Sequence, residues 1–110
     1  MKIPSTVIIR GVRWRIYQED KAPARLKAKG MLSRKGTLGI THFDTHEIVI
    51  ASGLTPEESC VTLVHELLHA VYHASGDQHL GPDLEERIVE AIDTPLYEVI
   101  LALIEANKNE

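Results

Sequence analysis

The chain has 110 residues, of which 44% are hydrophobic and 25% are charged. This composition is ordinary for a globular protein and excludes wholesale disorder, and the length predicts a single domain over residues 1–110. The one cysteine, Cys60, excludes an internal disulfide and favours a reducing compartment. No apolar run is long enough to span a bilayer, and residues 1–5 lead into a strand-like pattern without the features of a signal peptide. We therefore expect a cytoplasmic protein with no membrane partner.

The net charge of −4 is unevenly distributed along the chain. Residues 1–36 carry ten of the twelve Lys and Arg residues and two acids, whereas residues 37–110 carry two basic residues and fourteen acids. A basic half can attract nucleic acid or an acidic protein. A solvent-facing sheet surface lined with Lys and Arg is the more ordinary explanation, so direct nucleic-acid binding is not expected.

The first half of the chain has the pattern of β-strands. From Thr6 to Tyr17, apolar β-formers alternate with basic residues, which predicts one half-buried strand. Further strands are predicted near residues 27–34, near residues 37–42 and at Glu47–Ala51, with a tight turn at Lys35-Gly36. Together they predict a small, mostly antiparallel sheet over about residues 6–51.

The second half changes to a helical period. Thr55, Pro56 and Glu58 form the pattern of a capping box, apolar residues then occupy most of the circumference, and Gly76 ends the segment. This predicts a mostly buried helix over about residues 55–75. Helical segments follow over about residues 83–106, and Pro95 is expected to kink or break them. The expected fold class is therefore α+β, with the sheet packed on the buried helix and a C-terminal helix.

The buried helix contains the motif His65-Glu66-Leu67-Leu68-His69. Residues four apart share one face of a helix, so the two imidazoles can bind one zinc ion, Zn2+. Glu66 lies about 100° round the helix, so it cannot be an equal ligand, but it can accept a proton from a metal-bound water. His73 lies about 12 Å along the axis from His65 and therefore cannot share the ion.

A hydrolytic zinc site needs a third protein ligand and one open position. The second helix offers three candidates by position alone, Glu85, Glu86 and Glu90. Glu85 projects among apolar residues of that helix, and Glu86 lies 17 residues past His69, enough for a loop and a helical return. The residues themselves leave this choice open.

The HExxH helix followed by a helical Glu resembles the zincin metallopeptidases of the glutamate-ligand (gluzincin) branch. The pattern is most similar to small phage and prophage zincin-like proteins and to ImmA/IrrE-type peptidases, and covers about residues 30–105. In that branch the ligand Glu has a polar or acidic residue four positions later and an apolar one six later. The resemblance implies Glu86 as the third ligand, because Glu90 and Ile92 follow it at those positions. It also implies Glu90 as the partner that orients a ligand histidine.

The remaining polar and aromatic candidates are expected to have simpler roles. His79 lies in the loop over the site, where it could donate a hydrogen bond in the transition state. We expect His42, His46 and His73 at the surface, Cys60 in the core, and Tyr72 and Tyr97 as packing aromatics.

These features predict a zinc-dependent metalloendopeptidase that acts on a peptide or protein substrate. Glu66 would be the general base, and the strand Glu47–Ala51 would be the sheet edge on which an extended substrate adds. The alternative is a zinc-containing, zincin-like binding or regulatory module without peptidase activity, acting on a DNA-associated protein. Glu66→Gln separates the two, because it should abolish hydrolysis while leaving the zinc content and the fold intact.

Overall fold

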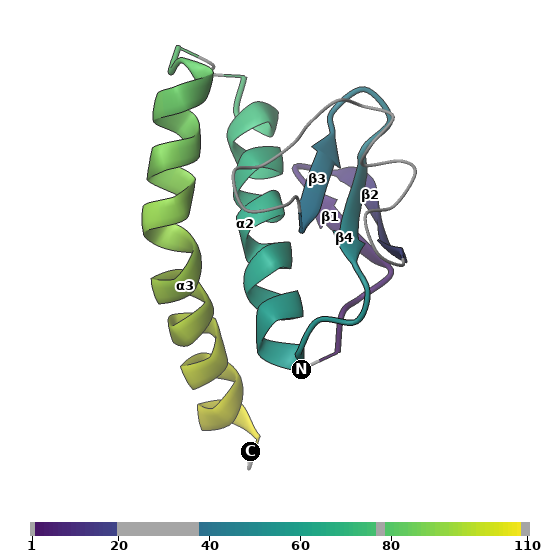
Figure 1. Ribbon diagram of the computed structural model, residues 1–110, viewed down its shortest axis with the longest axis vertical. Helices are drawn as coiled ribbons and strands as arrows, with labels where there is room; N and C mark the ends of the chain where they lie inside the picture. Colours follow the sequence, from purple (N-terminus) through teal and green to yellow (C-terminus); the bar gives the residue numbers. More distant parts are fainter. Residues whose placement is uncertain (1, 20–37, 77–78, 109–110) are drawn as a thin grey trace.

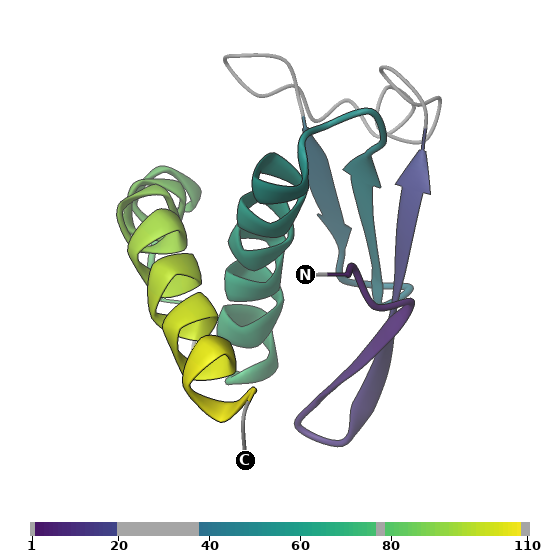
Figure 2. The ribbon, with the colours of Figure 1, turned by 90° about the horizontal axis from the view of Figure 1, so that it is seen from below.

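The computed structural model describes residues 2–19, 38–76 and 79–108. It has an α+β fold, as predicted, in which helix α2 lies between a four-stranded sheet and helix α3 (Figures 1 and 2). The elements are β1 (Thr6–Ile9), β2 (Val12–Glu19), β3 (Gly39–His42), β4 (Glu47–Ala51), α2 (Pro56–Ala74) and α3 (Pro82–Asn107). The strand expected at 27–34 and the turn at Lys35-Gly36 lie outside the described residues. No helix among the described residues is long and apolar enough to cross a membrane.

The single strand predicted from Thr6 to Tyr17 is wrong, because a tight turn divides it into β1 and β2. Ile9 pairs with Val12, which leaves Arg10 and Gly11 as the two loop residues. Both have positive φ angles, of 48° and 81°, and this is the signature of a type I′ hairpin turn. Such turns favour Asn-Gly, so an Arg at the first position gives no signal in the sequence.

The strand order in the sheet is β1-β2-β4-β3. Two of the three pairings are antiparallel, as the sequence predicts, while β2 and β4 are parallel. The prediction that Glu47–Ala51 is the sheet edge is wrong, since β4 lies between β2 and β3. Among the described residues β3 has one strand neighbour and is the edge beside α2. The sequence pattern specifies which residues form strands, but the order of strands depends on tertiary packing.

The core forms where α2 packs on the sheet. Ile48 and Ile50 of β4 are fully buried against Leu63 and Ala70 of α2, together with Trp14 and Ile16 of β2. Because side chains alternate along a strand, Gly39 and Thr41 of β3 also point toward α2, and both lie close to Glu66. This packing places the edge strand directly beside the HExxH motif.

Helix α2 begins and ends as the sequence predicts. The Thr55 hydroxyl accepts a hydrogen bond from the Glu58 amide at 3.1 Å, and the Glu58 carboxylate accepts one from the Thr55 amide at 3.0 Å. These two bonds complete the capping box. The helix ends before Gly76, which has a φ of 78°. Such a left-handed residue closes many helices.

Helix α3 is continuous from Pro82 to Asn107, so the predicted break at Pro95 is wrong. Pro95 is exposed, whereas Val89 before it and Tyr97 after it are buried, and α3 packs along α2. Tyr97 packs with Cys60 and Val64 of α2. These contacts stabilise the helix on both sides of the proline, which locally costs about 3 kcal/mol.

Candidate metal centre

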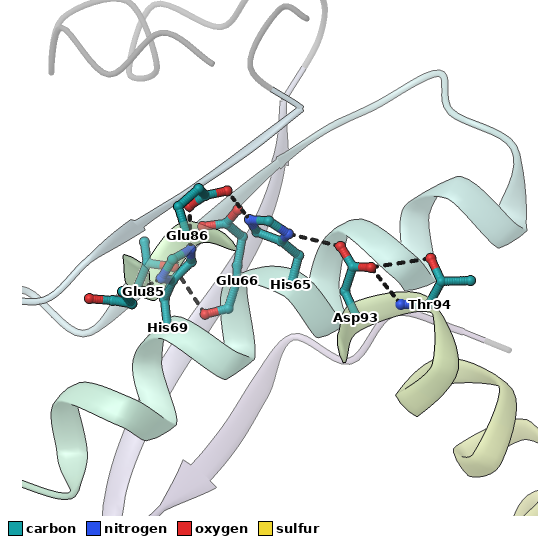
Figure 3. A network of polar contacts seen from close by, with 8 residues as sticks. His65, Glu66, His69, Glu85, Glu86, Asp93 and Thr94 are labelled. Atoms are coloured by element: carbon teal, nitrogen blue, oxygen red, sulfur yellow. Dashed lines mark hydrogen bonds and ion pairs between the residues drawn. The ribbon is translucent and has the colours of Figure 1, made fainter. Parts of the chain in front are cut away.

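The described residues contain one group of side chains that could hold a metal ion, formed by His65, His69 and Glu86. One ligand atom from each lies within 4.8 Å of the others. The Nε2 atom of His65 is 2.8 Å from Oε1 of Glu86, and the Nε2 atom of His69 is 2.9 Å from Oε2 of the same carboxylate. Figure 3 shows the carboxylate between the two rings. The structure therefore brings together the three residues expected as ligands.

The two histidines occupy neighbouring turns on one face of α2. Their ring centroids are 5.1 Å apart, and both side chains are less than one-fifth exposed. Glu86 comes from the second turn of α3, which begins at Pro82 after its N-cap residue Gly81. The side chain of Glu86 is 39% exposed, so the centre is open on that side.

The other ring nitrogen of each histidine is held by a second carboxylate from α3. Nδ1 of His65 is 2.9 Å from Oδ2 of Asp93, and Nδ1 of His69 is 2.5 Å from Oε2 of Glu85 (Figure 3). Such a carboxylate fixes the orientation and tautomer of a metal-binding imidazole. With Nδ1 donating to the carboxylate, the Nε2 lone pair is available to a metal ion.

The prediction that Glu90 orients a ligand histidine is wrong. Glu90 is exposed on α3, and Asp93 and Glu85 make the two contacts instead. Asp93 lies seven residues, close to two full turns, after Glu86, so both point toward α2. Glu85, the rival candidate for third ligand, is placed on the far nitrogen of His69, away from Glu86.

Glu66 lies beneath the edge strand, with 7% of its surface exposed. The Thr41 hydroxyl is 2.8 Å from Oε1 of Glu66 and 3.1 Å from its backbone carbonyl. Gly39 allows this close packing, because a Cβ there would be 3.0 Å from Cγ of Glu66. Burial raises the pKa of Glu66, although the Thr41 hydrogen bond and the nearby histidines act in the opposite direction.

This donor set fits a zinc ion. Zinc in hydrolytic sites takes three nitrogen or oxygen ligands and keeps one position open. Tetrahedral bonds of about 2.0–2.1 Å place neighbouring donors roughly 3.3 Å apart, and the imidazole and carboxylate atoms here are separated by 2.8 and 2.9 Å. Movements of side-chain ends alone would therefore accommodate the ion.

A comparison with protein families gives an independent result. The peptidase-family model described as the IrrE N-terminal-like domain matches residues 18–98, which is most of the chain. The chain belongs to this family. The expected relationship to ImmA/IrrE-type peptidases is thereby confirmed. No curated protein and no solved structure matches the chain.

The electrostatics of the IrrE-like domain favour positive charge at the centre. Burial lowers the pKa of His65, but the Asp93 hydrogen bond and the charges of Glu66, Glu86 and Asp93 together outweigh it, so the net shift is upward. Carboxylates that raise the affinity of this ring for a proton also favour a metal cation at the same nitrogen.

The remaining histidines of the IrrE-like domain lie outside the group of three. His42 is 6% exposed, so the expectation that it lies at the surface is wrong, because it belongs to β3 rather than to a turn. His46 is exposed, as expected. His73 is half-buried rather than exposed, because its ring stacks on Phe43 with centroids 3.5 Å apart. His79 is exposed in the loop before α3.

The structure bears out the core assignment of Cys60 and refines that of the tyrosines. Cys60 is buried, and Tyr97 packs beside it as an aromatic core residue. The hydroxyl of Tyr72 accepts a hydrogen bond from the Leu80 amide at 2.9 Å, which ties the loop before α3 to α2.

The sequence did not predict the roles of four residues around the centre: Asp93, Glu85, Thr41 and Gly39. A seven-residue spacing from Glu86 is a usable signal for Asp93, because positions two turns apart share a face. Thr41 and Gly39 come from a strand about 25 residues before the motif. Their position gives no sequence signal, since it depends on how β3 packs on α2.

Proposed function

We propose that this IrrE-like domain is a zinc-dependent peptidase of the gluzincin type, with His65, His69 and Glu86 as ligands and Glu66 as general base. One observation carries the proposal. Two Nε2 atoms converge on one carboxylate while both Nδ1 atoms are held by other carboxylates. Surface histidines without a function have no need of this arrangement, which fixes both the position and the tautomer of each ring.

The residues around the centre have a clear division of labour in this proposal. A bound zinc ion would supply a Lewis acid and lower the pKa of its water to about 7. Glu66 accepts the proton of the attacking water and then delivers it to the leaving amine. The Thr41 hydroxyl holds the carboxylate in place, and burial raises its pKa, which makes it a stronger proton acceptor than a solvated Glu.

The edge strand β3 offers a place for an extended peptide or protein substrate. The Leu38 carbonyl accepts a hydrogen bond from the Ala51 amide at 2.7 Å, so Leu38 faces β4. In an antiparallel pair the direction alternates from residue to residue. Gly39 and Thr41 therefore direct their backbone N–H and C=O groups away from β4. A substrate added along this edge would lie next to Glu66, which both residues approach.

The test compares the wild type with Glu66→Gln, using hydrolysis of a fluorescein-labelled unfolded protein and the zinc content of each preparation. We expect about one zinc per chain in both proteins, hydrolysis by the wild type only, and loss of that hydrolysis with a chelator. His46→Gln is the matched control, since His46 is an exposed histidine outside the group. Equal hydrolysis by Glu66→Gln would refute Glu66 as the base, and zinc without hydrolysis in the wild type would refute the peptidase.

A further inference from the structure

Helix α3 carries a second apolar face that no described element covers. Five large apolar side chains are exposed along it: Leu84 (45%), Ile88 (38%), Ile92 (41%), Val99 (55%) and Leu103 (60%). Pro95, which lies between Ile92 and Val99, is exposed as well. We call these six residues the outer stripe. Figures 1 and 2 show α3 as the outermost layer, with α2 on one side and no described element on the other. Charged and polar residues normally occupy the face of a helix that is exposed to solvent.

The outer stripe runs nearly parallel to the axis of α3. It consists of positions 84, 88 and 92 and of the positions eleven residues after each of them, 95, 99 and 103. An eleven-residue repeat corresponds to about 3.67 residues per turn, near the value of a straight α-helix. The stripe therefore stays within a band of roughly 100° along nearly the whole of α3.

We propose that the outer stripe pairs with the outer stripe of a second copy of this chain, antiparallel about a two-fold axis. The order of spacings, 4, 4, 3, 4, 4, is the same in both directions along the helix. Two antiparallel copies thus place Leu84 opposite Leu103, Ile88 opposite Val99, and Ile92 opposite Pro95, twice each. A two-fold interface requires this kind of self-complementary surface, whereas a different partner would not require a symmetric pattern.

The charges beside the stripe agree with the antiparallel direction. Arg87 and Glu98 lie on the same flank of the stripe, about 20° apart round the helix. In the antiparallel pair, Arg87 of each copy lies across from Glu98 of the other. In a parallel pair the same flank of the two copies would lie on opposite sides of the interface, so Arg87 of one copy would not meet Glu98 of the other. Exposed ion pairs contribute little affinity, so their role here is to select the orientation.

The dimer would leave the metal centre accessible. Glu86 lies on the side of α3 that faces the α2 histidines, and it is about 150° round the helix from the middle of the stripe. The inference therefore does not depend on the proposed peptidase activity. Since one helix face per copy makes a small interface, we expect a dissociation constant in the micromolar range.

Sedimentation velocity over a range of protein concentrations tests the proposal. We expect the wild type to dimerise and Ile92→Lys, near the two-fold axis, to raise the dissociation constant on the order of 100-fold. Ile104→Lys is the matched control, because Ile104 is similarly exposed at 39% but lies on another side of α3. It should dimerise like the wild type, and circular dichroism should show both variants folded.

The orientation is tested by charge reversal. Arg87→Glu and Glu98→Arg should each weaken the dimer, and the double variant should restore it. A wild type that stays monomeric at the highest concentration overturns the inference and leaves the stripe to a different partner. Dimerisation that survives Ile92→Lys, or that is lost in Ile104→Lys with the fold intact, overturns it as well. Loss of zinc or of hydrolysis would not affect these outcomes.

Discussion

Removing the carboxylate of Asp93 should weaken zinc binding without unfolding the protein. Oδ2 of Asp93 is 2.9 Å from Nδ1 of His65, and both side chains are less than one-fifth exposed. Solvent therefore screens this hydrogen bond only weakly. A hydrogen bond to a charged group contributes about 1.5–3 kcal/mol, and in zinc affinity this corresponds to a roughly 10- to 150-fold loss. We expect Asp93→Ala to fall in this range and Asp93→Asn, which keeps an acceptor, to lose less.

The assay is an equilibrium competition for zinc against a fluorescent chelator, with thermal unfolding of the metal-free proteins measured in parallel. Glu90→Ala is the matched control, because Glu90 is an exposed acid on the same helix that contacts neither histidine ligand. Its zinc affinity should equal that of the wild type. If Asp93→Ala binds zinc as tightly as the wild type, or if Glu90→Ala binds it more weakly than Asp93→Ala, the assignment of the orienting carboxylate is incorrect.

Three further substitutions test the surroundings of the centre and the hairpin. Thr41→Val should cost about 1–3 kcal/mol of folding stability and reduce the hydrolysis rate, because Glu66 loses its hydroxyl donor; Thr41→Ser should retain the rate, and equal loss in both variants would contradict this role. Gly39→Ala should lower the free energy of unfolding in urea by about 1–3 kcal/mol, since the added methyl group meets Glu66 at 3.0 Å, and an unchanged urea midpoint would argue against that contact. Arg10→Asn should raise the stability by about 0.5–1 kcal/mol, because Asn tolerates the left-handed conformation before Gly11 better than Arg. A lower melting temperature for this last variant would argue against the type I′ turn.

Short-range patterns predicted the elements that carry the ligand motif. The capping box of Thr55 and Glu58 and the terminating Gly76 act within a few residues, so the bounds of α2 follow from the sequence. The strand at Glu47–Ala51 was likewise predicted with its observed bounds. Local propensity decides these features, and tertiary contacts do not oppose it.

Features that depend on how elements pack were not predictable in the same way. Glu86 and Glu90 are one turn apart, about 6 Å along α3. A shift of α3 along α2 by that distance would bring Glu90 close to the place that Glu86 occupies beside His65 and His69, and would move Glu86 one turn away. The sequence does not specify this register, because it is set by packing of side chains such as Tyr97 against Cys60 and Val64. The order of strands, which places β4 in the interior of the sheet, has the same origin.

The continuity of α3 through Pro95 links the fold to the centre. Glu85, Glu86 and Asp93 reach the histidines from about two and a half turns of helix before the proline, while the buried Tyr97 lies after it. A helix broken at Pro95 would free its first half from the contacts of Tyr97, and the three carboxylates would lose their common register on α2. The packing that overrides the local cost of the proline is therefore the same packing that brings a ligand and two orienting acids to one pair of imidazoles.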